Sequence, residues 1–236
     1  MVKTIHRANT RGTADFGWLK ANYSFSFANY YGPSRVHFGL LRVFNDDHIA
    51  PGMGFGTHPH DNMEIVTIPL EGSLAHKDSM GSEKTISPNE VQIMSAGTGV
   101  THSEYNHSQT EPVKLFQLWV FPKERNIQPR YDQKLFDPSE RKNKWQYVVS
   151  PKHENALWIN QDAYFSLGNF EKEQQTIYHL NNADHGVYLM VIQGSITVAG
   201  ENLERRDAIG ISGINELQLK INADDTRLLL IEVQMN

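Results

Sequence analysis

The sequence contains no cysteine among its 236 residues. This absence excludes disulfide bonds, thiolate metal ligands, iron–sulfur clusters and a cysteine nucleophile. Any metal site in this protein must therefore be built from histidine, carboxylate groups and water.

Long hydrophobic runs and an excess of basic residues are also missing. The longest apolar runs, residues 187–192 and 228–231, fall well short of the about 20 residues that span a bilayer. No apolar segment follows the first residues, so no signal peptide is expected. The formal net charge of −5 argues against nucleic-acid binding, which favours a basic surface. We therefore expect a cytoplasmic protein that binds neither membranes nor nucleic acid directly.

What the sequence does contain is a series of short apolar runs separated by turn residues. None of it shows sustained helical periodicity, although residues 137–142 or 161–164 could hold one helical turn. The pattern predicts an all-β fold. The expected strands are residues 37–44, 64–70, 91–94, 113–121, 177–180, 187–192, 196–198, 208–211, 217–221 and 227–233.

An internal repeat relates the two halves of the chain. Residues 70–74 match residues 192–196, each an apolar strand that closes on a Gly-Ser turn, and residues 89–95 resemble residues 206–212. The repeat predicts two related β-barrels, with domains at 1–136 and 137–236 joined around residues 136–145.

Four side chains in the first half have the spacing and chemistry of metal ligands. His58 and His60 form one pair, and His102 and Glu104 form another, each within a predicted strand. Residues two apart on a strand point to the same face, so each pair offers two donors in one direction. Imidazole and carboxylate groups suit a transition metal, and we expect one ion between the two pairs. The alternative is a hydrogen-bonded polar cluster in a barrel mouth.

Three further residues are candidates near this centre. Glu64 has the same parity as the first histidine pair, so it could be a fifth donor, but we favour a role as an acceptor that holds a ligand histidine. Phe55 and Met94 could wall an apolar pocket above the metal, or could simply be core residues. The other histidines lack a partner at ligand spacing and are expected to have surface or hydrogen-bonded structural roles.

The second copy of the repeat holds different residues at the ligand positions. Leu180 and Asn182 correspond to the first histidine pair, and Leu219 and Ile221 correspond to the second pair. Because three of the four donors are replaced by apolar groups, we expect the second barrel to bind no metal.

Two motifs carry a resemblance to a known family. Gly52, His58-Pro59-His60 and Glu64 match the first cupin motif, and Gly99, His102 and Asn106 match part of the second. Within the cupins the chain resembles the pirin family, most closely the bacterial pirin-like quercetin 2,3-dioxygenases. The matching stretches are residues 26–31, 41–47, 58–64, 92–99 and 102–105. Glu64 to Gly72 spans one residue more than the usual cupin spacing, and the carboxylate ligand comes from the second motif, as in pirins.

The resemblance implies a bicupin, two tandem cupin (double-stranded β-helix) barrels, with one metal in the N-terminal barrel. The ligands carried over are His58, His60, His102 and Glu104. The implied reaction is the oxidative ring cleavage of a flavonol such as quercetin by O2 with release of carbon monoxide. Glu104 or Glu64 would accept the substrate proton, and the sequence leaves that choice open.

The identity of the metal and the class of function also have alternatives. Fe(II) is expected for oxygen chemistry, while Mn, Ni, Co, Cu or Zn suit the same donors. The rival function is that of a metal-containing, redox-sensing regulatory protein that binds a transcription or metabolic-enzyme partner.

Overall fold

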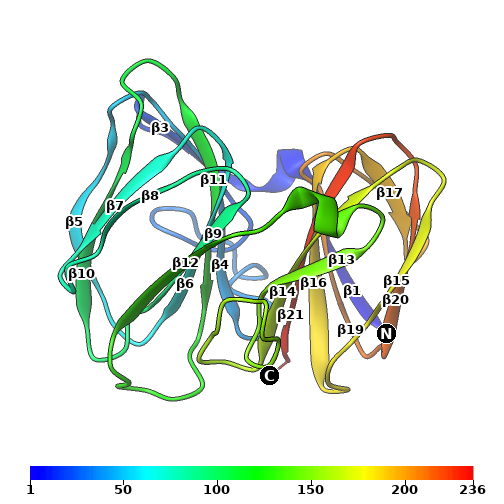
Figure 1. Cartoon of the computed structure of the whole chain (residues 1–236). Helices are drawn as coiled ribbons and strands as arrows, with labels where there is room; N and C mark the ends of the chain where they lie inside the picture. Colours follow the sequence, from blue (N-terminus) through cyan, green and yellow to red (C-terminus); the bar gives the residue numbers. More distant parts are fainter. Residues whose placement is uncertain (236) are drawn as a thin grey trace.

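The computed structural model describes residues 1–235, and strands make up most of it. The two short 3-10 helices of this range are η1 (Ala8–Thr10) and η2 (Pro138–Arg141), the latter within the range where a helical turn was expected. The chain forms two lobes that lie side by side, each made of strands (Figure 1). The all-β prediction is confirmed.

The first lobe is a barrel of two antiparallel sheets. The larger sheet has the order β12-β9-β6-β11-β4-β3-β2, and the smaller has the order β5-β10-β7-β8. Their bounds are β2 (Gly12–Asp15), β3 (Leu19–Tyr23), β4 (Leu41–Ile49), β5 (Gly54–His60), β6 (Glu64–Glu71), β7 (Leu74–Asp78), β8 (Glu83–Ile86), β9 (Glu90–Ser95), β10 (Val100–Asn106), β11 (Val113–Val120) and β12 (Arg130–Leu135).

The second lobe repeats this pattern ten strands later. Its sheets have the orders β1-β19-β16-β21-β14-β13 and β15-β20-β17-β18, so each strand from β13 to β21 pairs as its counterpart does in the first barrel. The bounds are β1 (Val2–His6), β13 (Trp145–Val149), β14 (Ala163–Phe170), β15 (Gln175–His179), β16 (His185–Gln193), β17 (Ser195–Val198), β18 (Glu201–Glu204), β19 (Ala208–Ser212), β20 (Glu216–Ile221) and β21 (Thr226–Gln234).

The first strand of the chain lies in the sheet of the second half. β1 pairs antiparallel with β19, from Val2 opposite Ser212 to His6 opposite Ala208. β12 occupies the equivalent place beside β9 in the first barrel. In Figure 1, β1 lies with β19 in the right-hand lobe. The division at residue 136 stays a prediction, and residues 2–6 are an observed exception to it.

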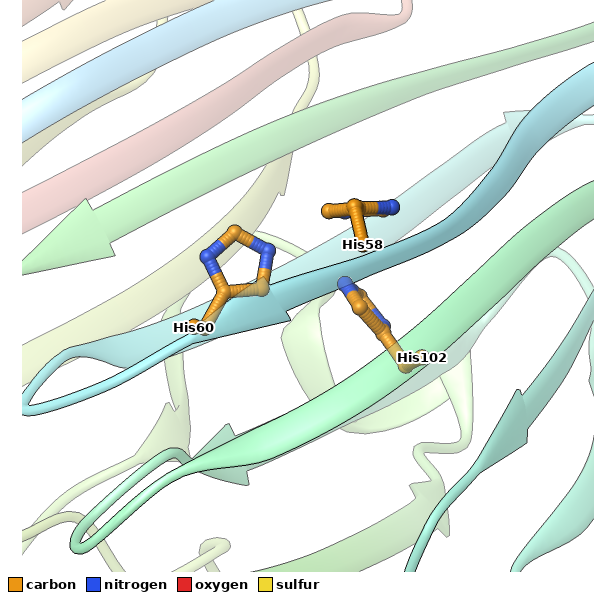
Figure 2. A group of neighbouring side chains, drawn as sticks. All are labelled: His58, His60 and His102. Carbon is orange, nitrogen blue, oxygen red and sulfur yellow. The ribbon is translucent and has the colours of Figure 1, made fainter.

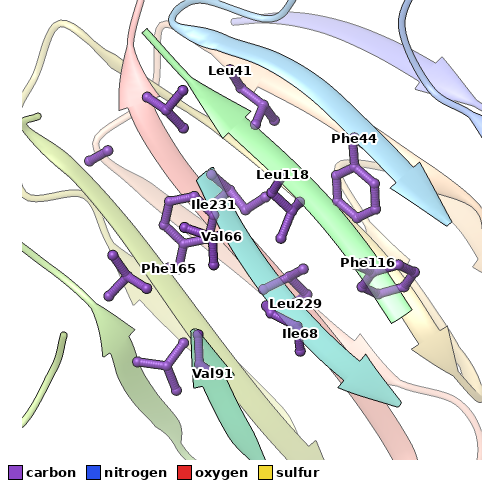
Figure 3. Close-up of a cluster of buried hydrophobic side chains, with 14 of the residues drawn as sticks. Leu41, Phe44, Val66, Ile68, Val91, Phe116, Leu118, Phe165, Leu229 and Ile231 are labelled. Carbon is purple, nitrogen blue, oxygen red and sulfur yellow. The ribbon is translucent and has the colours of Figure 1, made fainter. Parts of the chain in front are cut away.

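The two large sheets pack face to face and share one hydrophobic core. On β6, Val66 and Ile68 face this shared core, while Ile65, the residue before Val66, packs in a separate cluster on the opposite face. Figure 3 shows side chains from both halves meeting in the shared core. Its labelled members are Leu41, Phe44, Val66, Ile68, Val91, Phe116 and Leu118 from the first half, with Phe165, Leu229 and Ile231 from the second.

The interior of each barrel lies on the side of the large sheet that faces away from this shared core. In the second barrel it is mostly apolar, with Glu232 and His185 as buried exceptions, whereas the first barrel gathers the buried polar and charged side chains described below. Among residues 1–235, no helix combines the length and the hydropathy needed to cross a membrane. The cytoplasmic location stays a prediction.

Candidate metal centre

Strands β5 and β10 run antiparallel and set the positions of the predicted ligands. His58 lies opposite His102 in the register, and a bulge after His102 places Glu104 opposite Phe55. Pro59 lies between the two histidines of β5. A proline has no N–H to donate, and it is tolerated here because β5 is an edge strand of the small sheet. In β10 the buried residues alternate, and both His102 and Glu104 point inward.

The structure brings the three imidazoles together. The ring centroids of His58 and His102 are 4.4 Å apart, and that of His60 lies 4.9 Å from each of them. One nitrogen from each ring lies within 4.8 Å of the others. Figure 2 shows the side chains extending from two neighbouring strands into the same space.

Glu104 lies in an adjoining group rather than in the group of three imidazoles. Its carboxylate lies within 4.8 Å of donor atoms of His102 and His76, so His102 is common to both groups. The Glu104 Oε2 atom accepts a 2.6 Å hydrogen bond from Gln117 Nε2, which fixes the carboxylate in the barrel interior. His102 is therefore the residue that links Glu104 to His58 and His60 in the predicted set of four ligands.

The hydrogen bonds of these side chains leave metal-binding atoms free. His58 Nδ1 lies 2.8 Å from the Gly56 carbonyl oxygen, which can only accept, so Nδ1 carries the proton and the Nε2 lone pair is available. Within residues 1–235, His102 Nε2 and Glu104 Oε1 are buried and have no hydrogen-bond partner. Buried polar atoms normally find a partner, so these atoms fit a site that a cation completes.

The electrostatics of the metal-free site also favour a cation. Burial, together with the neighbouring histidines, lowers the pKa of His102 to about 3 and that of His60 to about 4. Both rings are therefore neutral and able to ligate at neutral pH. Burial raises the pKa of Glu104 to about 7, against the opposing effect of its bond from Gln117. A bound cation would compensate the buried carboxylate charge.

A cavity of about 370 Å³ opens onto this centre. His58, His60 and Glu104 line it together with further polar side chains, including Asp47. The aromatic part of the wall is Phe16, Trp18, Tyr23, Phe27, Phe55 and Trp119. The volume falls within the range of about 300–1,000 Å³ for small-molecule pockets, and flat aromatic walls suit a planar apolar ligand.

Comparison with known proteins places the chain in a family. The family model for pirin matches residues 4–120, and the model for the quercetinase C-terminal cupin domain matches residues 147–233. A protein of Escherichia coli (strain K12) named quercetin 2,3-dioxygenase is 42% identical over 231 residues, 97% of each chain. The chain belongs to the pirin family.

Other relatives of this pirin carry related names. A putative quercetin 2,3-dioxygenase of Pseudomonas aeruginosa is 42% identical over 225 residues, 94% of this chain and 95% of that one. The crystal structure of the Escherichia coli bacterial pirin YhhW in complex with nickel(II) aligns over 100% of both chains, with a TM-score of 0.94 and 38% identity. The family confirms the bicupin fold predicted from the sequence.

The second barrel of this pirin has apolar side chains at the ligand positions that the repeat identified. Leu219 and Ile221, at the positions of the second ligand pair, are buried in its core, and Leu180 packs against the same cluster. Among the described residues, the groups of three donors near enough to share an ion all lie in the first barrel.

The predicted role of Met94 in the pocket wall is wrong, whereas Phe55 does line the cavity. Met94 is fully buried in a cluster with Ile65, Ala96 and Val100. Trp119 packs against that cluster and also lines the cavity, so it stands where Met94 was expected. Its ring centroid is 4.9 Å from that of His60 in an edge-to-face contact.

The predicted place of Glu64 beside the ligand histidines is also wrong. β5 ends at His60, and Asn62 adopts a positive φ of 45° before β6 begins, so the turn breaks the parity that the sequence argument assumed. Glu64 Oε2 instead accepts hydrogen bonds from Ser95 Oγ (2.8 Å) and from the backbone N–H of Asn160 in the second half (3.1 Å). Glu64 thus joins the two barrels and leaves Glu104 as the candidate proton acceptor.

Glu64 gives a testable pH dependence of stability. Burial raises its pKa to about 7, against opposing hydrogen bonds from Ser95 and Asn160, while in the unfolded chain it ionises near 4.5. The folded state binds more protons between these values, so this group costs stability as the pH rises, by about 3 kcal/mol above pH 7. Glu64→Gln should remove that loss and unfold at higher urea concentration than the wild type at pH 8, with no gain at pH 4.

Two controls accompany this measurement. Glu83→Gln changes an exposed carboxylate and should leave the pH profile unchanged. The Glu64 variant should also keep the metal content of the wild type, because its side chain lies outside the cavity. A loss of metal from this variant would contradict the placement of Glu64 between the barrels.

The structure also reveals a residue that the sequence reasoning set aside. His76 is buried in β7, opposite Glu104 of β10, and its Nε2 atom lies 3.0 Å from Asp78 Oδ2. The spacing of His76 and Asp78 is the same two-residue interval used to find the ligands. The interval by itself marks the pair, since His102 and Glu104 are likewise a histidine and a carboxylate two residues apart.

Proposed function

We propose that this pirin is a metal-dependent dioxygenase that cleaves the heterocyclic ring of a flavonol such as quercetin, with O2 as the oxidant and carbon monoxide as a product. The observation that carries the proposal is the cavity, whose aromatic walls end at His58, His60 and Glu104. The names of the relatives support the same reaction class.

The ligand set that we propose is His58, His60, His102 and Glu104, with Fe(II) as the ion. A bound transition metal supplies Lewis-acid polarisation of a substrate hydroxyl and the redox chemistry that oxygen requires. The donors fit this ion because the free atoms at His102 Nε2 and Glu104 Oε1 are buried and unpartnered in the described chain. Imidazole and carboxylate donors also suit nickel, the metal named for the Escherichia coli pirin.

The protein residues position the substrate and manage its proton. The aromatic walls, with Trp119 against His60, receive the flat rings and exclude water from the end of the cavity. Glu104 is held by Gln117 through Oε2, so Oε1 is the oxygen that would hold the ion or, once free of it, accept the proton of the enolic hydroxyl. Asp47 lines the same cavity, and burial with the charges of Asp46 and Glu104 raises its pKa well above the ordinary value.

The test is direct turnover. Protein purified without a His-tag column is analysed for metal, stripped, reloaded with Fe(II) or Ni(II), and incubated with quercetin in air. We expect loss of the flavonol absorbance with release of one carbon monoxide per quercetin, and neither in the chelated control. Protein that carries one metal per chain and leaves quercetin intact would contradict the proposal.

A further inference from the structure

A line of three side chains connects the metal centre to the turn between β7 and β8. His102 Nδ1 lies 3.5 Å from His76 Nδ1, and His76 Nε2 lies 3.0 Å from Asp78 Oδ2. The side chains of His76 and Asp78 are both fully buried. Pairing of β7 with β10 sets the line, since Asp78 lies opposite His102 in the register.

The far end of this line is fixed by the backbone. Asp78 Oδ1 accepts hydrogen bonds from the N–H groups of Met80 (2.9 Å) and Ser82 (3.0 Å), so its other oxygen is held toward His76. Tyr131 of β12 packs against the His76 ring, with centroids 4.7 Å apart. Rotation of the His76 ring away from His102 and Asp78 would therefore disturb its packing against Tyr131 of β12.

The hydrogen-bonding rules assign the protons along the line. An ionised Asp78 only accepts, so His76 carries its proton on Nε2 and presents a lone pair at Nδ1. That lone pair accepts from His102, whose proton is then on Nδ1. His102 Nε2 is left as a lone pair, and this is the atom that is buried without a partner among residues 1–235.

We propose that His76 and Asp78 are positioning residues for the metal, a relay that fixes His102 in the tautomer that binds an ion through Nε2. The inference rests on the proposed role of His102 as a ligand and deepens it. Ligand histidines usually donate their second ring nitrogen to a carboxylate or carbonyl, and loss of that partner costs about 10- to 100-fold in metal affinity. In this protein the imidazole of His76 lies between the ligand His102 and the carboxylate of Asp78.

Asp78→Asn is the most informative variant because it is nearly isosteric. The new amide oxygen can keep the bonds from Met80 and Ser82, while its NH2 group faces His76 and donates to Nε2. His76 must then carry its proton on Nδ1 and donate to His102, whose remaining proton moves to Nε2. His102 Nε2 then carries a proton and cannot bind the metal, while the turn between β7 and β8 keeps its hydrogen bonds to residue 78.

The probe is Co(II), with affinity measured by competition against a chelator and the site reported by the visible absorption of the bound ion. We expect Asp78→Asn to bind Co(II) at least about 10-fold more weakly and with an altered spectrum. Glu83→Gln is the control, since it removes an exposed carboxylate of β8 without touching the relay or the ligands, and it should bind Co(II) like the wild type.

A double-mutant cycle separates the relay from a purely structural role. His76→Phe keeps the ring against Tyr131 and removes both nitrogens, so Asp78 can no longer influence His102. In that background Asp78→Asn should cost less than about 2-fold further, because the two changes act through one path. An Asp78→Asn effect of the same size in both backgrounds would overturn the proposal, as would wild-type affinity in Asp78→Asn alone.

Nitrogen NMR of the metal-free protein gives a readout that needs no metal. His102 should carry its proton on Nδ1 in the wild type and on Nε2 in Asp78→Asn, and the opposite assignment in the wild type would overturn the relay. Failure of the wild type to bind Co(II) would instead count against the ligand set, so the two proposals fail in different measurements.

Discussion

Replacement of His102 by alanine is expected to abolish metal binding and flavonol turnover together. His102 belongs to both donor groups of the first barrel, and its buried Nε2 faces no other partner within the described part of the chain. Its removal leaves the histidines of β5 and the carboxylate of Glu104 without the residue that links them. The affinity should fall further than the about 10- to 100-fold that loss of a supporting hydrogen bond costs.

The measurement is metal content per chain by elemental analysis, followed by quercetin consumption in air. His107→Ala is the control, because His107 is exposed, follows β10 directly and lies outside both donor groups. It should match the wild type in both assays. A His102 variant that retains its metal would mean that the ion sits elsewhere.

Alanine at Gly54 is expected to displace Glu104 and weaken metal binding by about 10- to 100-fold, the range over which affinity falls when the support of a metal ligand is lost. A Cβ at Gly54 would overlap the carbonyl oxygen of Glu104 and would lie 2.5 Å from the Cα atom of Tyr105. Both contacts are with backbone, so β5 must move away from β10 at the bulge that sets the Glu104 side chain.

Gly56→Ala is the matched control two residues along the same strand. A Cβ there would meet only the Tyr105 hydroxyl, at 3.8 Å, and the Gly56 carbonyl would still accept from His58. Co(II) competition and thermal unfolding should separate the pair, with Gly56→Ala near the wild type. Equal affinities for the two variants would show that β5 can shift without moving the ligand.

The fold and the histidine cluster were accessible from the sequence because strand alternation is a strict rule. His58 and His60 share a face, and the apolar residues Leu219 and Ile221 mark the second barrel as different. The rule failed for Glu64 because Asn62 turns the chain between the two strands. The alternation of side chains relates residues within one strand, and it does not predict which way residues on the far side of a turn will face.

The remaining errors have similar local causes. β4 begins at Leu41 rather than at residue 37, since Phe38 and Leu41 bridge across a tight turn. The helical turn considered at 161–164 is absent from the described structure, where β14 begins at Ala163. The role of His76 depends on the pairing of β7 with β10, and spacing along β7 alone does not place its ring beside His102.

The pairing of β1 with β19 ties the order of synthesis to the order of assembly. The first barrel can gather its own strands, β2 to β12, as soon as they have been made, whereas the opening segment must wait for a partner about 200 residues downstream. Bringing such distant segments together costs loop-closure entropy, so we expect β1 to pair with β19 late in folding. The second barrel is therefore completed by a strand that precedes the whole first barrel in the sequence, and residues 137–236 do not contain all of its strands.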